Sequence, residues 1–312
     1  MIKILASDGM EKGAIAALEA KGCEVTCEFF EPEALKAAVK EYDVLVVRSA
    51  TKVREPHIDA ALETGKLQLI IRGGVGVDNI DVKYAEEKGI AVRNTPKASS
   101  DAVAELALAH MFSVARFVSL AGHTMREGKW EKKAYKGIEL TGRTVGIVGY
   151  GRIGQALGRR CQALGMKVLA YDIYQNKELE CDTMRYVEMD ELLANSDIIS
   201  LHVPSLPGQP LVNAETIAKM KDGVILINTS RGPVVNDADL REALDSGKVY
   251  AAGADVSTVE PIPADSPLLG AKNMFLTPHI AWATFEARER LMDIAVKNVE
   301  AFLAGTPVNT VC

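Results

Sequence analysis

The sequence predicts an α/β protein with two doubly wound parallel sheets, each in its own domain. The chain has 312 residues, about twice the roughly 150 residues typical of one domain. Short β-branched runs alternate with longer stretches of helical period, a pattern typical of parallel strands joined by crossover helices. This pattern occurs once before residue 99 and again after Gly142, which predicts two separate sheets.

The first series of elements lies before residue 99. Leu35, Ala38, Val39 and Tyr42 have the spacing i, i+3, i+4 and i+7, which places them on one face of a helix. The strands expected in this series are residues 2–6, 24–27, 44–48, 69–72 and 90–93.

The second series follows Gly142, after two connecting segments. The Ala-rich segment 99–120 is apolar on nearly every side, so we expect a helix that either threads between the domains or faces a partner subunit. The polar stretch 121–141, which contains Trp130, is interpreted as an exchanged arm of a dimer or as a solvated loop. A final helix over 283–303 is expected to pack back on the first domain. The strands expected here are residues 144–148, 167–171, 198–203, 224–228, 251–256 and 274–277.

Composition and charge exclude several classes of protein. The 36 Lys and Arg against 42 Asp and Glu give a net charge of −6, which argues against a general nucleic-acid binder. The N-terminus lacks the apolar run of a secretory signal, and no long stretch is free of charge, so we expect a cytoplasmic protein without a membrane segment. Spacing typical of a zinc site is absent from the sequence, which predicts no metal and free thiols at Cys23, Cys27, Cys161, Cys181 and Cys312.

A glycine-rich loop predicts a dinucleotide site. Gly149, Gly151 and Gly154 fit the pattern G-x-G-x-x-G between an expected strand and an expected helix. Gly149 would permit the tight turn, Gly151 the approach of a pyrophosphate, and Gly154 close packing of helix on strand. Asp172 ends the next strand, where an acid accepts hydrogen bonds from a ribose and disfavours a 2′-phosphate. The sequence therefore favours NAD over NADP.

Three charged residues follow strands of the second series, where ligands of open α/β sheets bind. Arg231 would bind a carboxylate through two parallel hydrogen bonds, and His279 would exchange a proton near neutral pH. Glu260 would fix the tautomer of that histidine. The alternative is that these are ordinary surface or structural groups. Of the other histidines, His202 would border the cofactor, His57 and His123 would be exposed, and His110 would pack within a helix.

In order and spacing, these motifs resemble those of the D-isomer-specific 2-hydroxyacid dehydrogenases, from about Val44 to the C-terminus. The resemblance implies a Rossmann NAD-binding domain at 99–286 inserted into a flavodoxin-like substrate-binding domain, 1–98 plus 287–312, usually in a homodimer. It implies Arg231 as the substrate anchor, His279 as the acid/base and Glu260 as its partner. The implied cofactor contacts are Gly149, Gly151, Arg152, Ile153, Gly154, Asp172, His202, Val203, Pro204, Thr229, Ser230, Arg231, Asp255, His279 and Ala281.

Within this family, the runs 47–53 and 73–79 look most like those of phosphoglycerate dehydrogenases. This implies hydride transfer at C2 of a small anionic 2-hydroxy or 2-keto acid, first D-3-phosphoglycerate, the substrate that enters serine biosynthesis. The run 280–284 instead resembles glycerate or hydroxypyruvate dehydrogenases, which keeps that substrate as the alternative. A remote alternative is an NAD-sensing binding protein, because C-terminal-binding-protein corepressors look like the same fold. The implied substrate contacts are Arg48, Ser49, Gly74, Val75, Gly76, Arg231 and His279.

Overall fold

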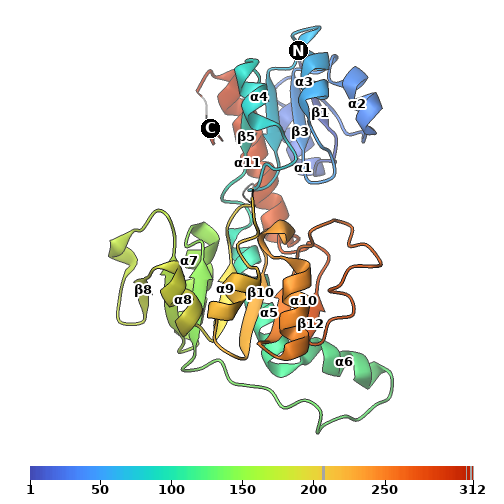
Figure 1. The fold of residues 1–312 in the computed structure, drawn as a ribbon. Coiled ribbons are helices and arrows are strands. Elements are labelled where there is room, and N and C mark those ends of the chain that lie inside the picture. The colour runs from blue at the N-terminus through green and yellow to red at the C-terminus, as the bar shows by residue number, and fades with distance from the viewer. Residues whose placement is uncertain (206–207, 307, 310, 312) are drawn as a thin grey trace. The chain divides into compact units, whose positions relative to one another are not determined.

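The computed structural model describes residues 1–205, 208–306, 308–309 and 311 (Figure 1). The chain divides into two compact units: unit 1 is Met1–Ser99 with Ala283–Cys312, and unit 2 is Ser100–Trp282. Unit 1 is therefore made of both ends of the chain, and unit 2 is the segment between them. The cysteine at position 312 lies outside the described residues, whereas Cys23, Cys27, Cys161 and Cys181 are free thiols.

Unit 1 contains, in the described part of the chain, a five-stranded parallel sheet in the order β2-β1-β3-β4-β5. This is the strand order of flavodoxin-like sheets. Its strands are β1 (Ile2–Ala6), β2 (Cys23–Thr26), β3 (Val44–Val47), β4 (Leu69–Arg72) and β5 (Ala91–Asn94). Its helices are α1 (Lys12–Glu19), α2 (Pro32–Ala38), α3 (Glu55–Leu62), α4 (Val82–Glu87) and α11 (Phe285–Leu303).

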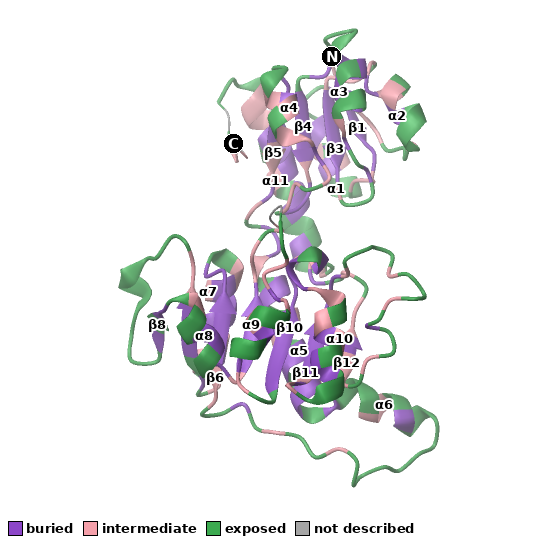
Figure 2. Cartoon of the chain, in the orientation of Figure 1, coloured by how far each residue is buried: buried purple, intermediate pink, exposed green. Residues whose placement is uncertain are grey.

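Alternate residues of these strands are buried on opposite faces of the sheet, as the period of two requires. Ile4 and Val44 share one core with α1 and with Leu291 of α11. Leu5 and Leu45 belong to the other core, with residues of α2, α3 and α4. Each fully buried Leu or Ile stabilises the fold by about 1.5–3 kcal/mol, so both faces contribute to the stability of unit 1 (Figure 2).

Unit 2 contains, among its described residues, a seven-stranded parallel sheet in the order β12-β11-β10-β9-β6-β7-β8. Two parallel sheets confirm the predicted α/β class. The strands are β6 (Thr144–Val148), β7 (Lys167–Tyr171), β8 (Met184–Tyr186), β9 (Ile198–Leu201), β10 (Val224–Asn228), β11 (Val249–Ala254) and β12 (Met274–Leu276). The helices are α5 (Ser100–Arg116), α6 (Val118–Arg126), α7 (Arg152–Ala163), α8 (Met189–Asn195), α9 (Ala214–Lys219) and α10 (Asp237–Ser246), with short 3-10 turns η1 (Lys177–Leu179) and η2 (Gly232–Val234).

Helices cover both faces of the unit 2 sheet. Residues of α5 and α7 share one core with the strands, and residues of α8, α9 and α10 share the other. Small residues such as Ala104 and Ala107 are fully buried on α5, which lets this helix lie close to β10 and β11 (Figure 2). The helix predicted for the Ala-rich segment is therefore a core helix of unit 2.

The segment after α5 differs from the prediction. Phe117 adopts a left-handed backbone with φ of 55°, which ends α5, and α6 begins directly after it. The polar stretch expected from residue 121 is thus helical up to Arg126, and the irregular part is 127–141. No single described helix is long and apolar enough to span a membrane. Helices α5 and α6 taken together reach that length and composition, but they are bent by 66° at the break between them.

Two further expectations differ from the structure. His57 was predicted to be exposed, and this is wrong: it is buried because its Nδ1 accepts a hydrogen bond from the Arg54 N–H and its Nε2 lies 3.0 Å from the Pro32 carbonyl oxygen. Strand β8 was not predicted, because a run of three residues around the exposed Arg185 is too short to establish a pattern. His123 is exposed and His110 is buried, as expected.

Candidate active site

The residues predicted to bind the cofactor all belong to unit 2, and most follow strands that are neighbours in its sheet. The carboxyl ends of parallel strands lie at one edge of a sheet, so loops after β6, β9, β10, β11 and β12 share that edge. The glycine loop and Arg152 and Ile153 follow β6, and Asp172 follows β7. The remaining residues follow β9 (His202, Val203, Pro204), β10 (Thr229, Ser230, Arg231), β11 (Asp255) and β12 (His279, Ala281).

The glycine loop has the geometry that a pyrophosphate site requires. Gly149 has a φ of +91°, and a Cβ there would lie 2.5 Å from the carbonyl oxygen of His202. A Cβ on Gly154 would lie 2.2 Å from the Gly149 carbonyl oxygen, which explains why α7 can approach the loop so closely. Apart from its chain neighbours, no described residue has an atom within 4 Å of a Cβ built on Gly151, so this position faces open space at the start of the 12-residue helix α7. That helix end offers unpaired N–H groups and partial positive charge to an anion.

Two buried polar atoms at the same edge of the sheet fit a dinucleotide. Thr229 Oγ1 and His202 Nδ1 are buried without a hydrogen-bond partner among the described residues, which is costly in a folded protein unless a ligand or water supplies one. The Nε2 atom of His202 lies 2.9 Å from Ser200 Oγ, and burial lowers the pKa of His202 to about 4. The side chain is therefore a neutral hydrogen-bonding group near pH 7. The glycine loop, the unpaired Thr229 and His202 atoms and the Asp172 carboxylate together suit NAD.

His279 and Glu260 form a directly hydrogen-bonded pair. The His279 Nδ1 atom lies 2.7 Å from Glu260 Oε2, and the other Glu260 oxygen accepts a hydrogen bond of 3.2 Å from the Ser257 N–H. Burial raises the pKa of Glu260, but the hydrogen bond and charge of His279, the Ser257 N–H and the charge of Arg231 together lower it more. Glu260 is thus an anion near neutral pH. The pair can hold the imidazole with Nε2 as the ring atom left for proton exchange.

Arg231 lies in a turn that is fixed by Asn228, the last residue of β10. The Asn228 Nδ2 group donates to the Arg231 carbonyl at 2.9 Å, and its Oδ1 accepts from the N–H and hydroxyl of Ser230. The Arg231 Nη1 atom donates to the Ser230 carbonyl at 2.7 Å. Asn228 is a supporting residue that the motifs alone do not single out, although an asparagine at the start of a turn is a known turn-forming feature.

Gly232 brings the Arg231 turn against the loop that carries Glu260. A Cβ on Gly232 would lie 2.0 Å from the Ser257 carbonyl carbon and 2.3 Å from the Thr258 nitrogen. The backbones of the two loops are therefore in direct contact, which explains how the charge of Arg231 acts on Glu260. Of the three charged residues predicted for catalysis, the structure pairs two by a hydrogen bond and places the third within electrostatic reach.

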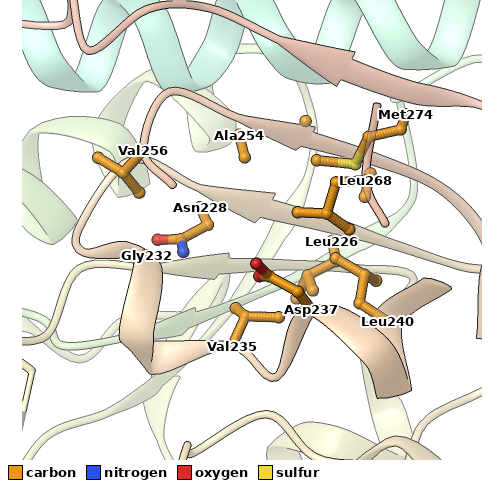
Figure 3. A pocket seen from close by; sticks show the side chains of 12 residues that line it. Leu226, Asn228, Gly232, Val235, Asp237, Leu240, Ala254, Val256, Leu268 and Met274 are labelled. Carbon is orange, nitrogen blue, oxygen red and sulfur yellow. The ribbon is translucent and has the colours of Figure 1, made fainter. Parts of the chain in front are cut away.

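A small cavity lies behind these loops (Figure 3). It has a volume of about 10 Å³, roughly the room for one water molecule. Its wall is mostly apolar, but the Asn228 amide and the Asp237 carboxyl also line it. Burial raises the pKa of Asp237, and a hydrogen bond with Thr258 opposes that shift. The cavity is too small for a substrate and belongs to the support of the two loops.

The remaining predicted residues belong to unit 1. Arg48 and Ser49 follow β3, and Gly74, Val75 and Gly76 follow β4. Asp8 accepts hydrogen bonds from the Arg48 N–H and from the N–H and hydroxyl of Thr51, which fixes the turn after β3. A Cβ on Gly74, whose φ is +151°, would overlap the guanidinium of Arg72.

Burial lowers the pKa of Arg48, and the charge of Arg288 lowers it further, whereas Asp8 and Glu11 oppose the shift. Arg288 itself pairs with Glu11 at 2.7 Å. Two cations and two carboxylates thus lie near one another in unit 1. Within the described residues, no group of three or more His, Cys, Asp or Glu side chains could hold a metal ion.

Comparisons with known proteins identify a family for unit 2. The model of a family described as "D-isomer specific 2-hydroxyacid dehydrogenase, NAD binding domain" matches residues 108–281. That range contains the glycine loop, Arg231, Glu260 and His279. More than half of the chain is therefore similar to the NAD-binding domain of this family.

Similar curated proteins carry two different substrate names. A hydroxypyruvate reductase of Blautia hydrogenotrophica is 54% identical over 243 residues, 76% of either chain, and one of Thermotoga maritima is 48% identical over 93% of this chain and 94% of its own. A D-3-phosphoglycerate dehydrogenase of Archaeoglobus fulgidus is 42% identical over 98% of this chain, which spans 58% of that protein.

Solved structures share the architecture of the whole chain. A glyoxylate reductase from Paecilomyes thermophila superimposes with a TM-score of 0.89 at 30% identity, covering 100% of this chain and 98% of its own. A D-lactate dehydrogenase from Aquifex aeolicus, complexed with NAD and lactic acid, gives a TM-score of 0.85 at 30% identity over 97% of this chain and 96% of its own.

Proposed function

The chain belongs to the D-isomer specific 2-hydroxyacid dehydrogenase family and is an NAD-dependent enzyme of CH–OH donors, and we propose that its substrate pair is hydroxypyruvate and D-glycerate. The observation that carries this choice is the 48% identity, over nearly the full length of both chains, to a protein named hydroxypyruvate reductase. The run Ile280-Ala281-Trp282, which resembles that of glycerate or hydroxypyruvate dehydrogenases, supports it.

In the proposed mechanism, the bound cofactor supplies hydride transfer between nicotinamide and C2 of the substrate. During reduction, protonated His279 donates a proton from Nε2 to the carbonyl oxygen, and Glu260 stabilises the imidazolium beforehand through Nδ1. During oxidation, neutral His279 accepts the hydroxyl proton. Arg231 binds the substrate carboxylate through two parallel hydrogen bonds and keeps its charge throughout.

The charges around Arg48 favour the unphosphorylated substrate. Asp8 and Glu11 act on Arg48, and Glu11 already pairs with Arg288. A phosphate dianion placed there would meet two carboxylates as well as two guanidinium groups, so much of the attraction would be offset. Hydroxypyruvate has no phosphate and avoids this cost.

A second candidate is 3-phosphohydroxypyruvate, the substrate to which the sequence alone points first. The specific observation in its favour is the closeness of Arg48 and Arg288, whose charges affect each other. Two guanidinium groups side by side are a common arrangement for a phosphate. This candidate is consistent with relatives named D-3-phosphoglycerate dehydrogenase.

The two candidates are separated by measuring kcat/KM for both keto acids with NADH, in the wild type, in Arg48→Ala and in the surface control Lys66→Ala. We expect the wild type to prefer hydroxypyruvate by about tenfold or more. We expect Arg48→Ala to lose activity on the phosphorylated substrate far more than on hydroxypyruvate, and Lys66→Ala to behave as wild type. A wild-type preference for the phosphorylated acid would overturn the proposal, and equal losses in Arg48→Ala would make Arg48 structural.

We also propose a homodimer formed through α5, α6 and the segment after them. Phe112, Val118, Leu120, Met125 and Trp130 are exposed there, between 40% and 79% of their surface. Exposed apolar side chains gathered on consecutive segments are typical of a protein interface. Analytical ultracentrifugation of the wild type should give a mass of twice 33.6 kDa. The double variant Val118→Asp with Met125→Asp should sediment as a monomer. A monomeric wild type would contradict the proposal.

A further inference from the structure

Three side chains connect helix α5 to the loop that carries His279. His110, on α5, is 4% exposed, and its Nε2 lies 3.0 Å from Thr277 Oγ1. Thr277, just after β12, donates its hydroxyl proton to Asp255 Oδ1 at 2.5 Å. Asp255, just after β11, is 1% exposed. A series of hydrogen bonds therefore connects helix α5 to the ends of strands β12 and β11.

The Asp255 carboxylate, the last of these three side chains, holds the backbone immediately after His279. Asp255 accepts hydrogen bonds from the Ile280 N–H at 2.9 Å and from the Ala281 N–H at 2.7 Å. Before His279, the N–H of His279 itself donates to the Thr277 carbonyl at 3.0 Å. The loop is thus fixed on both sides of the histidine.

His279 needs this support because of its backbone. Its φ is +54°, a left-handed conformation that costs a residue with a side chain roughly 1 kcal/mol or more. Such a conformation persists only where the surroundings determine it. The Asp255 hydrogen bonds after His279 and the bond of the His279 N–H to Thr277 are contacts that hold it here.

The number of hydrogen-bond donors around Asp255 and Thr277 shows that His110 is a donor. Asp255 accepts three hydrogen bonds, and the single proton of Thr277 is already given to it. Thr277 Oγ1 must therefore accept from His110 Nε2–H. Burial lowers the pKa of His110, although the charge of Asp255 opposes this, so the ring is neutral with its proton on Nε2.

The imidazole has a built place in the core. A Cβ on Gly253 of β11 would lie 2.9 Å from His110 Nδ1 and 3.0 Å from its Cβ. Only a residue without a side chain at position 253 leaves this room. The position of the donor on α5 is therefore set by β11 as well as by its own helix.

We propose that His110 is a positioning residue for His279. It orients the Thr277 hydroxyl toward Asp255, which in turn holds the backbone on which His279 presents its ring to the substrate. The inference rests on the proposed catalytic role of His279 and adds a residue to which neither the motifs nor the comparisons assign a role.

The test compares His110→Leu, which removes the donor, with His110→Gln, whose side-chain amide can donate from a similar place. Met111→Leu, at the neighbouring fully buried position, controls for repacking of α5. We expect His110→Leu to lower kcat about 3- to 10-fold, the range of one net hydrogen bond. KM and the NADH affinity measured by fluorescence should stay nearly constant, and His110→Gln should restore most of kcat.

Equal losses in His110→Leu and His110→Gln would overturn the proposal, because they would show a packing role only. Unchanged kcat in His110→Leu would overturn it too. If His110→Leu does not fold, Thr277→Val removes the central hydroxyl and should give the same loss of kcat. His279→Ala is measured in parallel: full activity there refutes the proposed function itself, whereas an inactive His279→Ala with unaffected His110 variants refutes only the positioning role.

Discussion

Gly232 allows the contact between the Arg231 turn and the Glu260 loop, and Gly232→Ala tests that contact. The added methyl group would lie 2.0 Å from the Ser257 carbonyl carbon, 2.1 Å from its oxygen and 2.3 Å from the Thr258 nitrogen. All three neighbours are backbone atoms, so no rotation of a side chain can relieve the overlap. One loop must move away from the other.

The size of the movement gives the expected loss of activity. Ordinary van der Waals contact begins near 3.4 Å, so the separation must grow from 2.0 Å by about 1.4 Å. Misplacement of a catalytic group by about 1 Å costs roughly 100-fold in rate. We therefore expect kcat/KM for hydroxypyruvate to fall at least about 100-fold, equivalent to about 2.7 kcal/mol of transition-state stabilisation.

The assay is the loss of NADH absorbance, with thermal unfolding measured to show that the variant is folded. The matched control is Gly13→Ala in α1, where a Cβ has no described neighbour within 4 Å. This control should retain full activity and gain about 0.5–1 kcal/mol in unfolding free energy. Wild-type kcat/KM in a folded Gly232→Ala would refute the argument that the two loops must touch.

Three more predictions concern single residues. His279→Ala should lower kcat by about 10²- to 10⁴-fold with NADH affinity nearly unchanged; wild-type turnover would exclude it as the acid/base. Asp172→Ala removes a carboxylate that would repel a 2′-phosphate, so the NADPH to NADH ratio of kcat/KM should rise about tenfold or more, and a constant ratio would contradict its position at the ribose. His202 has a pKa of about 4, below the ordinary 6.5. Between these values the unfolded chain binds more protons, so unfolding free energy falls as pH drops from about 6.5 toward 4. Urea titrations give the unfolding free energy at pH 7 and at pH 5, and its decrease between the two pH values should be smaller in His202→Gln than in the wild type. Equal decreases would contradict the lowered pKa of His202.

Much of the fold follows from local pattern. β1, β4, β6, β7 and β10 have the predicted bounds, because each is a short apolar run whose length is set by buried positions on both faces. β8 could not be predicted because it has only three residues and because Met184 and Tyr186 are buried by the shared core of unit 2, which a local pattern does not reveal. The break at Phe117 was also missed, since nothing in an alanine-rich helical pattern marks one left-handed residue.

The site was predicted to a smaller extent, because motifs identify groups but not what holds them. The positions of Arg231, Glu260 and His279 follow from strand ends and residue chemistry. The supports Asn228, Gly232 and His110 do not, because their roles depend on which strands become neighbours. His57 shows the same limit: its chemistry suggests exposure, whereas hydrogen bonds to Arg54 and Pro32 bury it.

The Arg231 loop and the His279 loop are held in a similar way, because in each case a buried polar side chain at a strand end binds the loop backbone. Asn228, the last residue of β10, holds the loop that follows its own strand, whereas Asp255, just after β11, holds the loop that follows the neighbouring strand β12; 4% and 1% of their surfaces are exposed. Burying the Asp255 carboxylate would cost several kcal/mol without partners, and its three donors offset that cost. Two of those donors are the N–H groups that follow His279. The hydrogen bonds that make the buried charge tolerable therefore also fix the catalytic loop, so a variant that removes one should lose stability and turnover together.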